Sequence, residues 1–210
     1  LAQEADLSVV VLGLSQRLEG EGGDRKDIAL PKVQTDLLKA IKAQGKPVIL
    51  VLNAGSALAI NWAKDEIDAI LSVGYPGEQG GNALADVLLG DYNPAGRLPI
   101  TYYSSLDELP DFENYDMRER TYRYYSGKPL YPFGFGLSYT DFSYSNLKSP
   151  ATVHAGDTLE IAVTVTNTGD RAGDEVVQVY LTDEKASTPR PQHQLVAFER
   201  VHLKKGEQKE

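Results

Sequence analysis

Two glutamates in a glycine-rich segment are the side chains best placed to do proton-transfer chemistry. Glu19 and Glu21 alternate with glycines just after a continuous apolar run. A carboxyl group can act as general acid and then as general base if it still holds a proton near the working pH, so its pKa should be raised. The neighbouring Glu19 and Asp24 favour a protonated Glu21 through like-charge repulsion, whereas Arg25 opposes it. From the residues alone, Glu21 is better explained as one surface carboxylate among 30 acidic residues.

The elements around this segment follow a strand–helix alternation. Residues 7–14, 47–52 and 69–73 are apolar runs typical of buried parallel strands, and 96–100 predicts a short fourth strand. Helices are expected from Pro31 to about Gly45 and from Gln79 to Leu89. This order predicts a parallel sheet flanked by helices, in which a loop after a strand lies at the carboxyl edge where open α/β sheets place their sites.

The second half of the chain has a different pattern. Residues 102–140 are rich in tyrosine, glycine and proline, and predict a long ordered connection. From about Phe142 the pattern has period two, with turn residues at 167–170 between runs at 159–166 and 176–181. Short strands joined by such turns indicate a β-sandwich of immunoglobulin or fibronectin type. We therefore expect three parts: an α/β domain over 1–101, a linker over 102–140 that packs on it, and a β-sandwich over 141–210. The first and last of these read as truncated at their outer ends.

Composition narrows the range of functions. The formal net charge of −9 repels phosphate backbones, which makes nucleic acid an unsuitable partner, and no apolar run is long enough to span a bilayer. The absence of cysteine removes disulfides and thiolate chemistry. The three histidines, His154, His193 and His202, lack metal-ligand spacing, so we expect neither a metal nor a cofactor. A nucleotide-binding α/β protein would need a phosphate-cradling loop after a strand, which the chain lacks.

Four ordered groups of motifs carry a resemblance to a known family. They are Gly20-Glu21-Gly22-Gly23-Asp24-Arg25 with Leu30-Pro31 and Gln34; Gly74-Tyr75-Pro76-Gly77-Glu78-Gln79-Gly80-Gly81 running through Ala85-Asp86-Val87-Leu88-Leu89-Gly90 to Asn93-Pro94-Ala95-Gly96-Arg97-Leu98-Pro99; Tyr122-Arg123-Tyr124 with Pro129-Leu130-Tyr131-Pro132-Phe133-Gly134-Phe135-Gly136-Leu137-Ser138-Tyr139; and Val165-Thr166-Asn167-Thr168-Gly169 with Gly173-Asp174-Glu175-Val176-Val177-Gln178-Val179-Tyr180. Together they resemble the C-terminal part of glycoside hydrolase family 3.

The resemblance implies a fold and a division of labour. It implies a flavodoxin-like α/β sandwich domain followed by a fibronectin type III-like domain. In the family, an aspartate on an N-terminal (β/α)8 barrel is the nucleophile of a retaining mechanism, and a glutamate of the α/β domain is usually the acid/base. No segment here resembles the barrel, so no residue here takes the nucleophile role. Glu21 is the first choice for the acid/base and Glu19 the second. The loop after Glu21 is shorter than in many relatives, which leaves this choice open.

The resulting interpretation is the C-terminal portion of a β-glucosidase or β-xylosidase that removes terminal non-reducing sugars from oligosaccharides. The expected partners are the barrel domain and the oligosaccharide, with a homodimer left open, and the expected location is periplasmic or extracellular. The alternative is a non-catalytic carbohydrate-binding or structural module built from the same two domains. In the linker, Asp116, Arg118, Arg120 and Tyr122 either reach a sugar or brace the connection by ion pairs and stacked rings.

Overall fold

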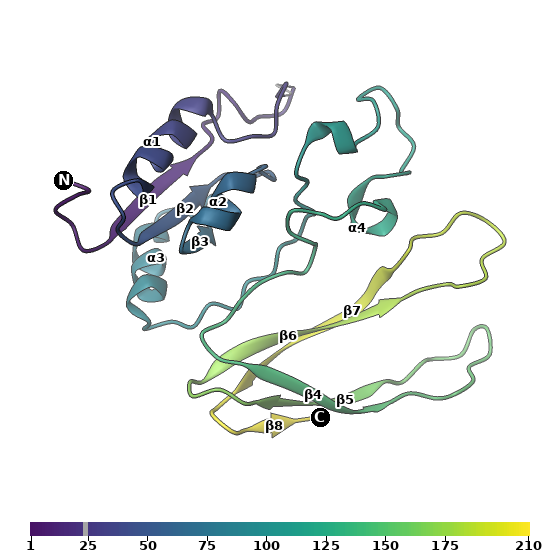
Figure 1. Cartoon of the computed structure of the whole chain (residues 1–210). Helices are drawn as coiled ribbons and strands as arrows, with labels where there is room; N and C mark the ends of the chain where they lie inside the picture. Colours follow the sequence, from purple (N-terminus) through teal and green to yellow (C-terminus); the bar gives the residue numbers. More distant parts are fainter. Residues whose placement is uncertain (23–24) are drawn as a thin grey trace. The chain divides into compact units, whose positions relative to one another are not determined.

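The computed structural model describes residues 1–22 and 25–210, and the chain divides into two compact units (Figure 1). The first unit contains residues 1–84 and 99–133, and the second contains residues 85–98 and 134–210. Among the described residues, none of the helices combines the length and apolar character that crossing a membrane requires.

A three-stranded parallel sheet forms the centre of the first unit. Strands β1 (Ser8–Gly13), β2 (Val48–Asn53) and β3 (Ala69–Ser72) lie in that order. The central strand β2 is the most buried of the three, and the side chains of Val48 and Leu50 have no exposed surface. Because all three strands are parallel, their carboxyl ends share one edge of the sheet.

Three helices belong to the α/β part of the chain: α1 (Lys32–Lys42), α2 (Asn61–Glu66) and α3 (Gly80–Leu89). Helix α1 begins directly after Pro31, which has no N–H to leave unpaired at a helix start. Its Leu38 is almost fully buried, which fixes the helix against the sheet.

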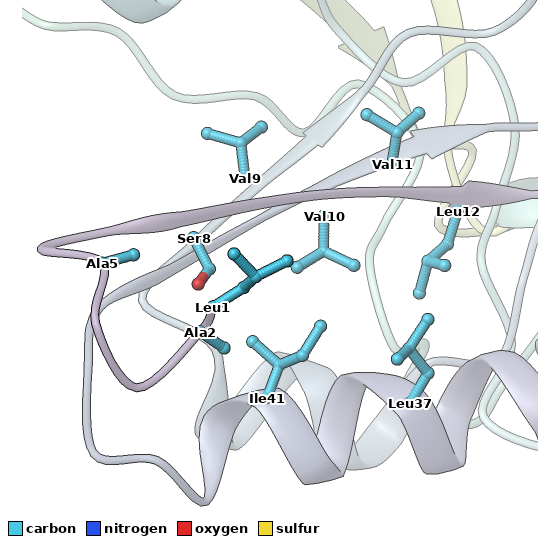
Figure 2. A pocket seen from close by; sticks show the side chains of 10 residues that line it. All are labelled: Leu1, Ala2, Ala5, Ser8, Val9, Val10, Val11, Leu12, Leu37 and Ile41. Carbon is cyan, nitrogen blue, oxygen red and sulfur yellow. The ribbon is translucent and has the colours of Figure 1, made fainter.

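The packing of α1 on β1 leaves a shallow apolar hollow. In Figure 2, Val10 and Leu12 of β1 point towards Leu37 and Ile41 of α1, whereas Val9 points to the opposite face. The hollow has a volume of about 460 Å³, and Ser8 supplies the only side-chain hydroxyl among its lining residues. An aliphatic lining of this kind offers packing surface and no group for chemistry.

The connection over 99–133 carries its own hydrogen-bond network. It contains the short helices η1 (Leu106–Glu108) and α4 (Thr121–Tyr124). The Glu108 carboxylate accepts hydrogen bonds from the Ser104 hydroxyl at 2.7 Å, the Ser104 N–H at 3.2 Å and the Tyr125 hydroxyl at 2.8 Å. These bonds order a segment that has little regular secondary structure.

The second unit contains two antiparallel sheets. One has the order β4-β5-β8 and the other pairs β6 with β7; the strands are β4 (Phe142–Lys148), β5 (Ala162–Asn167), β6 (Gly173–Leu181), β7 (Gln194–Leu203) and β8 (Gln208–Lys209). Val165 of β5 packs with Val201 and Leu203 of β7 in one buried cluster, so the two sheets share a core. The expected order, a parallel α/β region followed by an antiparallel β region, is confirmed.

Several predicted elements need correction. Residues 96–100 were expected to form a strand, and this is wrong: they adopt no regular structure. Leu98 exchanges two backbone hydrogen bonds with Gly134 and Phe135, but Pro99 has no N–H to continue a ladder. The expected strand over 159–166 begins only at Ala162. Helix α2 and strand β7 were not predicted.

Candidate functional site

The site is built at the carboxyl edge of the parallel sheet, where three loops begin after Gly13, Asn53 and Ser72. The end of β1 is fixed to helix α1, because the Gln34 side chain accepts from the Gly13 N–H at 2.9 Å and donates to the Gly13 carbonyl at 2.8 Å. The following loop carries the two candidate glutamates and therefore starts from a fixed point.

Glu19 joins all three loops. Its Oε2 accepts a hydrogen bond from the Gly55 N–H at 2.8 Å, on the loop after β2, and another from the Tyr75 hydroxyl, on the loop after β3. A Cβ on Gly55 would lie 2.7 Å from the Tyr75 ring and 3.6 Å from the Glu19 carboxylate. Glycine at position 55 thus allows the Tyr75 ring to approach the backbone closely.

The surroundings of Glu19 favour its ionised form. Burial raises the pKa of Glu19, but hydrogen bonds from Ser56, Tyr75 and the Gly55 N–H, together with the charge of Arg25, outweigh burial and leave the pKa below its usual value. Glu19 is therefore a carboxylate held in place, which is the opposite of what a general acid needs.

Arg25 is bound to the loop after β2, which also contacts Glu19. Its Nη2 donates to the Ser56 hydroxyl at 2.7 Å and to the Ala57 carbonyl at 3.2 Å. Asp24, the other charged neighbour of Glu21, lies outside the described residues. Arg25 Nη1 and Asn53 Oδ1 are buried without a hydrogen-bond partner in the part of the chain that the structure describes. This edge of the sheet therefore contains polar atoms that could still form hydrogen bonds.

Glu21 occupies a different environment from Glu19. Its side chain is exposed, and it has no hydrogen-bond partner among residues 1–22 and 25–210. Gly22, which follows it, has a φ of 75°, a left-handed conformation that glycine adopts without strain. The structure thus places the two candidates on one loop, with Glu19 tied to its neighbours and Glu21 presented to solvent.

Gly80, at the start of α3, allows close packing. A Cβ at this position would lie 2.5 Å from the Pro76 ring. Sequence reasoning missed Gly55 and Tyr75 as members of the site. Each lies on a loop that follows a parallel strand, and that position was the available signal.

The linker candidates brace the connection in a way that differs from the expected ion pairs. Arg120 Nη2 donates to the backbone carbonyls of Asn114 at 2.7 Å and Asp111 at 3.0 Å. Tyr122 stacks on Phe133, with ring centroids 4.1 Å apart. This ring pair borders a hollow of about 420 Å³ that Arg123 and other side chains of the connection also line.

The histidines do not form a metal site with the described acidic residues, in which no cluster of three or more possible ligands occurs. His202 contacts the Asp174 carboxylate at 2.6 Å, and Arg200 binds the same carboxylate. These contacts lie within the β6–β7 pair and are far along the chain from the loop of Glu19.

Comparison with known proteins defines the class of protein to which this chain belongs. Residues 1–139 match the glycosyl hydrolase family 3 C-terminal domain, and residues 175–210 match the fibronectin type III-like domain. The chain belongs to glycosyl hydrolase family 3.

Curated relatives and solved structures agree with this assignment. The chain is 44% identical to a periplasmic β-glucosidase of Salmonella typhimurium, covering 99% of this chain and 29% of the relative. It is 43% identical to a xylan 1,4-β-xylosidase of Xylanibacter ruminicola, covering 98% of this chain and 25% of the relative. A β-glucosidase structure from Erythrobacter marinus has a TM-score of 0.88 at 40% identity, covering 99% of this chain and 29% of that one. The chain thus spans between a quarter and a third of the length of these relatives.

Proposed function

We propose that this chain is the acid/base-bearing portion of a retaining β-glycosidase that removes terminal non-reducing β-linked sugars from oligosaccharides. The observation that carries the proposal is the loop of residues 15–22 at the carboxyl edge of the sheet, with a restrained and an exposed carboxyl group, in a chain of this family. Retaining hydrolysis needs two carboxyl groups about 5–5.5 Å apart, one as nucleophile and one as acid/base. We assign the second role to this chain and the nucleophile to an aspartate on a barrel domain outside residues 1–210.

Glu21 is the proposed acid/base. Its carboxyl group is exposed and so is free to approach a sugar bound by a partner domain, whereas Glu19 spends one oxygen on Gly55 and Tyr75. The lowered pKa of Glu19 also supports this order, because an acid that is ionised at the working pH has no proton to give. Glu19 remains the second choice.

We propose that the substrate carries a terminal glucose or xylose in β linkage. The names of the relatives divide between β-glucosidase and β-xylosidase at almost equal identity. Both sugars have the same ring arrangement at the reacting carbon, so the proposed chemistry of Glu21 is the same for either. We further propose that the domains extend over 1–101, 102–140 and 141–210, and that the enzyme acts in the periplasm or outside the cell, in line with the name of the Salmonella relative.

The test uses the complete enzyme, including the barrel. We expect Glu21→Gln to reduce kcat/KM on 4-methylumbelliferyl β-glucoside and β-xyloside by about 10²–10⁴-fold, the usual contribution of general acid–base catalysis. Activity on the 2,4-dinitrophenyl glycosides, whose leaving group needs no proton, should fall much less. Azide should restore turnover of the variant and yield the β-glycosyl azide, because this anion attacks the glycosyl-enzyme without the general base that water needs.

Glu113→Gln is the matched control, since Glu113 is exposed on the connection and lies outside the site. It should behave as the parent enzyme on every substrate. If Glu21→Gln also behaves as the parent enzyme, while Glu19→Gln shows the leaving-group dependence and the azide rescue, the acid/base is Glu19. If neither variant shows them, the proposed role of this loop is wrong.

A further inference from the structure

A hydrogen bond joins the first and third loops of the carboxyl edge. The Tyr75 hydroxyl, on the loop after β3, donates to Glu19 Oε2, on the loop after β1. The same oxygen accepts from the Gly55 N–H at 2.8 Å, on the loop after β2. One carboxylate oxygen is therefore the point at which segments 36 and 56 residues away in the sequence are tied to the loop of Glu21.

The protonation states that this bond needs are the ones the site favours. The hydrogen bond to Glu19 is the main cause that raises the pKa of the Tyr75 phenol, and the pKa of Glu19 is lowered. Both shifts favour a protonated Tyr75 as the donor and an ionised Glu19 as the acceptor. A hydrogen bond to a charged acceptor is roughly twice as strong as one between neutral groups.

The loop held by this bond would otherwise be hard to fix. Gly20 and Gly22 flank Glu21, and glycine loses more backbone freedom on ordering than any other residue. The Tyr75 ring is 58% exposed, so burial of the ring contributes little to holding it. The contacts that hold the ring are the hydrogen bond of its hydroxyl to Glu19 and the close approach of the ring to Gly55.

We infer that Tyr75 is a positioning residue for catalysis, which fastens the loop of Glu21 to the β2 and β3 loops through the Glu19 carboxylate. The inference rests on the proposed function, because it assigns Tyr75 a role in the reaction that Glu21 carries out. Tyr75 acts through Glu19, which lies two residues from the acid/base in the sequence. Tyr75 does not itself donate a proton to the sugar. A displacement of about 1 Å at a reacting group can cost about 10²-fold in rate, which is the effect that this bond prevents.

Tyr75→Phe in the complete enzyme removes the hydroxyl and keeps the ring. We expect kcat on 4-methylumbelliferyl glycosides to fall about tenfold or more, within the range that misplacement of a catalytic group produces. KM should change little, and kcat/KM on 2,4-dinitrophenyl glycosides, which reports only the step that forms the glycosyl-enzyme, should remain near the parent value. Azide should not rescue this variant, because Glu21 still occupies its own place. Titration of active sites with a 2-deoxy-2-fluoroglycoside normalises each rate to the folded enzyme, so a loss of stability alone would change no ratio.

Tyr125→Phe is the matched control. It also removes a phenol that donates to a carboxylate in the first unit, that of Glu108, but it does so in the connection. Its normalised rates on both substrate types should equal those of the parent. If Tyr75→Phe fails to fold, Glu19→Gln attacks the same bond from the acceptor side and should show the same dependence on leaving group, again without azide rescue.

The outcomes separate this inference from the proposed function. If Glu21→Gln shows the expected losses and rescue but Tyr75→Phe keeps the parent ratio between the two substrates, the positioning role is overturned and the acid/base assignment stands. If Glu21→Gln has no effect on either substrate, the proposed function fails first. The inference is supported if Tyr75→Phe raises the ratio of the 2,4-dinitrophenyl rate to the 4-methylumbelliferyl rate tenfold without azide rescue. The same ratio should be unchanged in Tyr125→Phe.

Discussion

The side-chain amide of Gln34 satisfies both backbone polar groups of Gly13. This pair of hydrogen bonds, at 2.9 and 2.8 Å, crosses 21 residues of sequence and joins the first turn of α1 to the last residue of β1. Every residue of the candidate loop follows from this point. The contact thereby links the stability of the α/β unit to the placement of its candidate site.

We expect Gln34→Ala to destabilise the chain by about 1–3 kcal/mol, because it leaves a part-buried N–H and carbonyl without partners. Gln44→Ala is the control: the Gln44 side chain, just beyond the end of α1, donates to the exposed backbone carbonyl of Ala40 on that helix. Urea denaturation of the full chain, followed by circular dichroism, measures both. Equal midpoints for the two variants would show that the Gly13 contact has no special value.

Adjacent glycines in α3 should respond in opposite directions. Gly81→Ala meets no atom within 4 Å, and alanine favours a helix over glycine by about 0.5–1 kcal/mol, so the melting temperature should stay or rise. Gly80→Ala places a Cβ 2.5 Å from the rigid Pro76 ring and should destabilise by about 1–3 kcal/mol. Differential scanning calorimetry of the two variants measures the difference, and a Gly80→Ala variant as stable as Gly81→Ala would contradict the close contact.

Removing one partner of the Arg97–Glu175 ion pair, in the second unit, should strongly destabilise the protein. Their side chains are only 13% and 12% exposed and approach within 2.7 Å, and the Tyr144 hydroxyl donates to the same carboxylate. Removing one partner of a buried pair typically costs about 3–5 kcal/mol, so we expect Arg97→Met to destabilise by this order. The double variant Arg97→Met/Glu175→Leu should recover most of the loss, since it removes both charges.

The exposed pair of Lys148 and Glu210 provides the contrast. Both side chains are more than half exposed, and surface pairs contribute about 0–1 kcal/mol. Lys148→Met should therefore leave the urea midpoint nearly unchanged. A loss as large as that of Arg97→Met would mean that burial does not set the value of these pairs.

The bond between Tyr125 and Glu108 predicts a dependence of stability on pH at both ends of the scale. Hydrogen bonds from Ser104 and Tyr125 lower the pKa of Glu108, so its contribution is present above the unfolded pKa and is lost as pH falls through the folded pKa. Burial and the bond to Glu108 raise the pKa of Tyr125 to about 12, so its contribution is complete below about pH 10 and is lost between about pH 10 and 12.

Urea midpoints measured from pH 3 to 12 distinguish the two groups. Glu108→Gln should flatten the acid limb of the profile, and Tyr125→Phe should flatten the alkaline limb. Asp107→Asn, which alters an exposed neighbour, should change neither limb by a comparable amount. Profiles of Glu108→Gln and Tyr125→Phe that run parallel to the parent would contradict the assigned pKa directions.

The sequence predicted the regular parts of the fold better than the junctions between them. The runs that became β1, β2 and β3 are long, apolar and close to Gly or Pro, so local pattern alone identified them. Residues 96–100 were predicted wrongly because their pairing with residues 134–135 is made by Leu98, and no local signal separates such a short contact from a strand. Strand β7 was missed because its residues are largely exposed, which hides the alternation.

The candidate site divides in the same way. Glu19 and Glu21 were identified because a glycine-rich loop after a strand has a known place in an α/β sheet. That Glu19 is the tied member of the pair could not be predicted, because its restraint depends on Tyr75 and Gly55, which are distant in sequence. Only the folded backbone brings the three loops together.

The interleaving of the two units limits how this protein could be rearranged by recombination. Residues 85–98 belong with the unit that resumes at residue 134, and they bond to it through Asn93 with Ser138 and Arg97 with Glu175. A crossover placed anywhere in the 99–133 connection would combine residues 85–98 of one parent with the β-sandwich strands of the other. The sandwich is therefore expected to be inherited together with the α/β region and not exchanged as a free module.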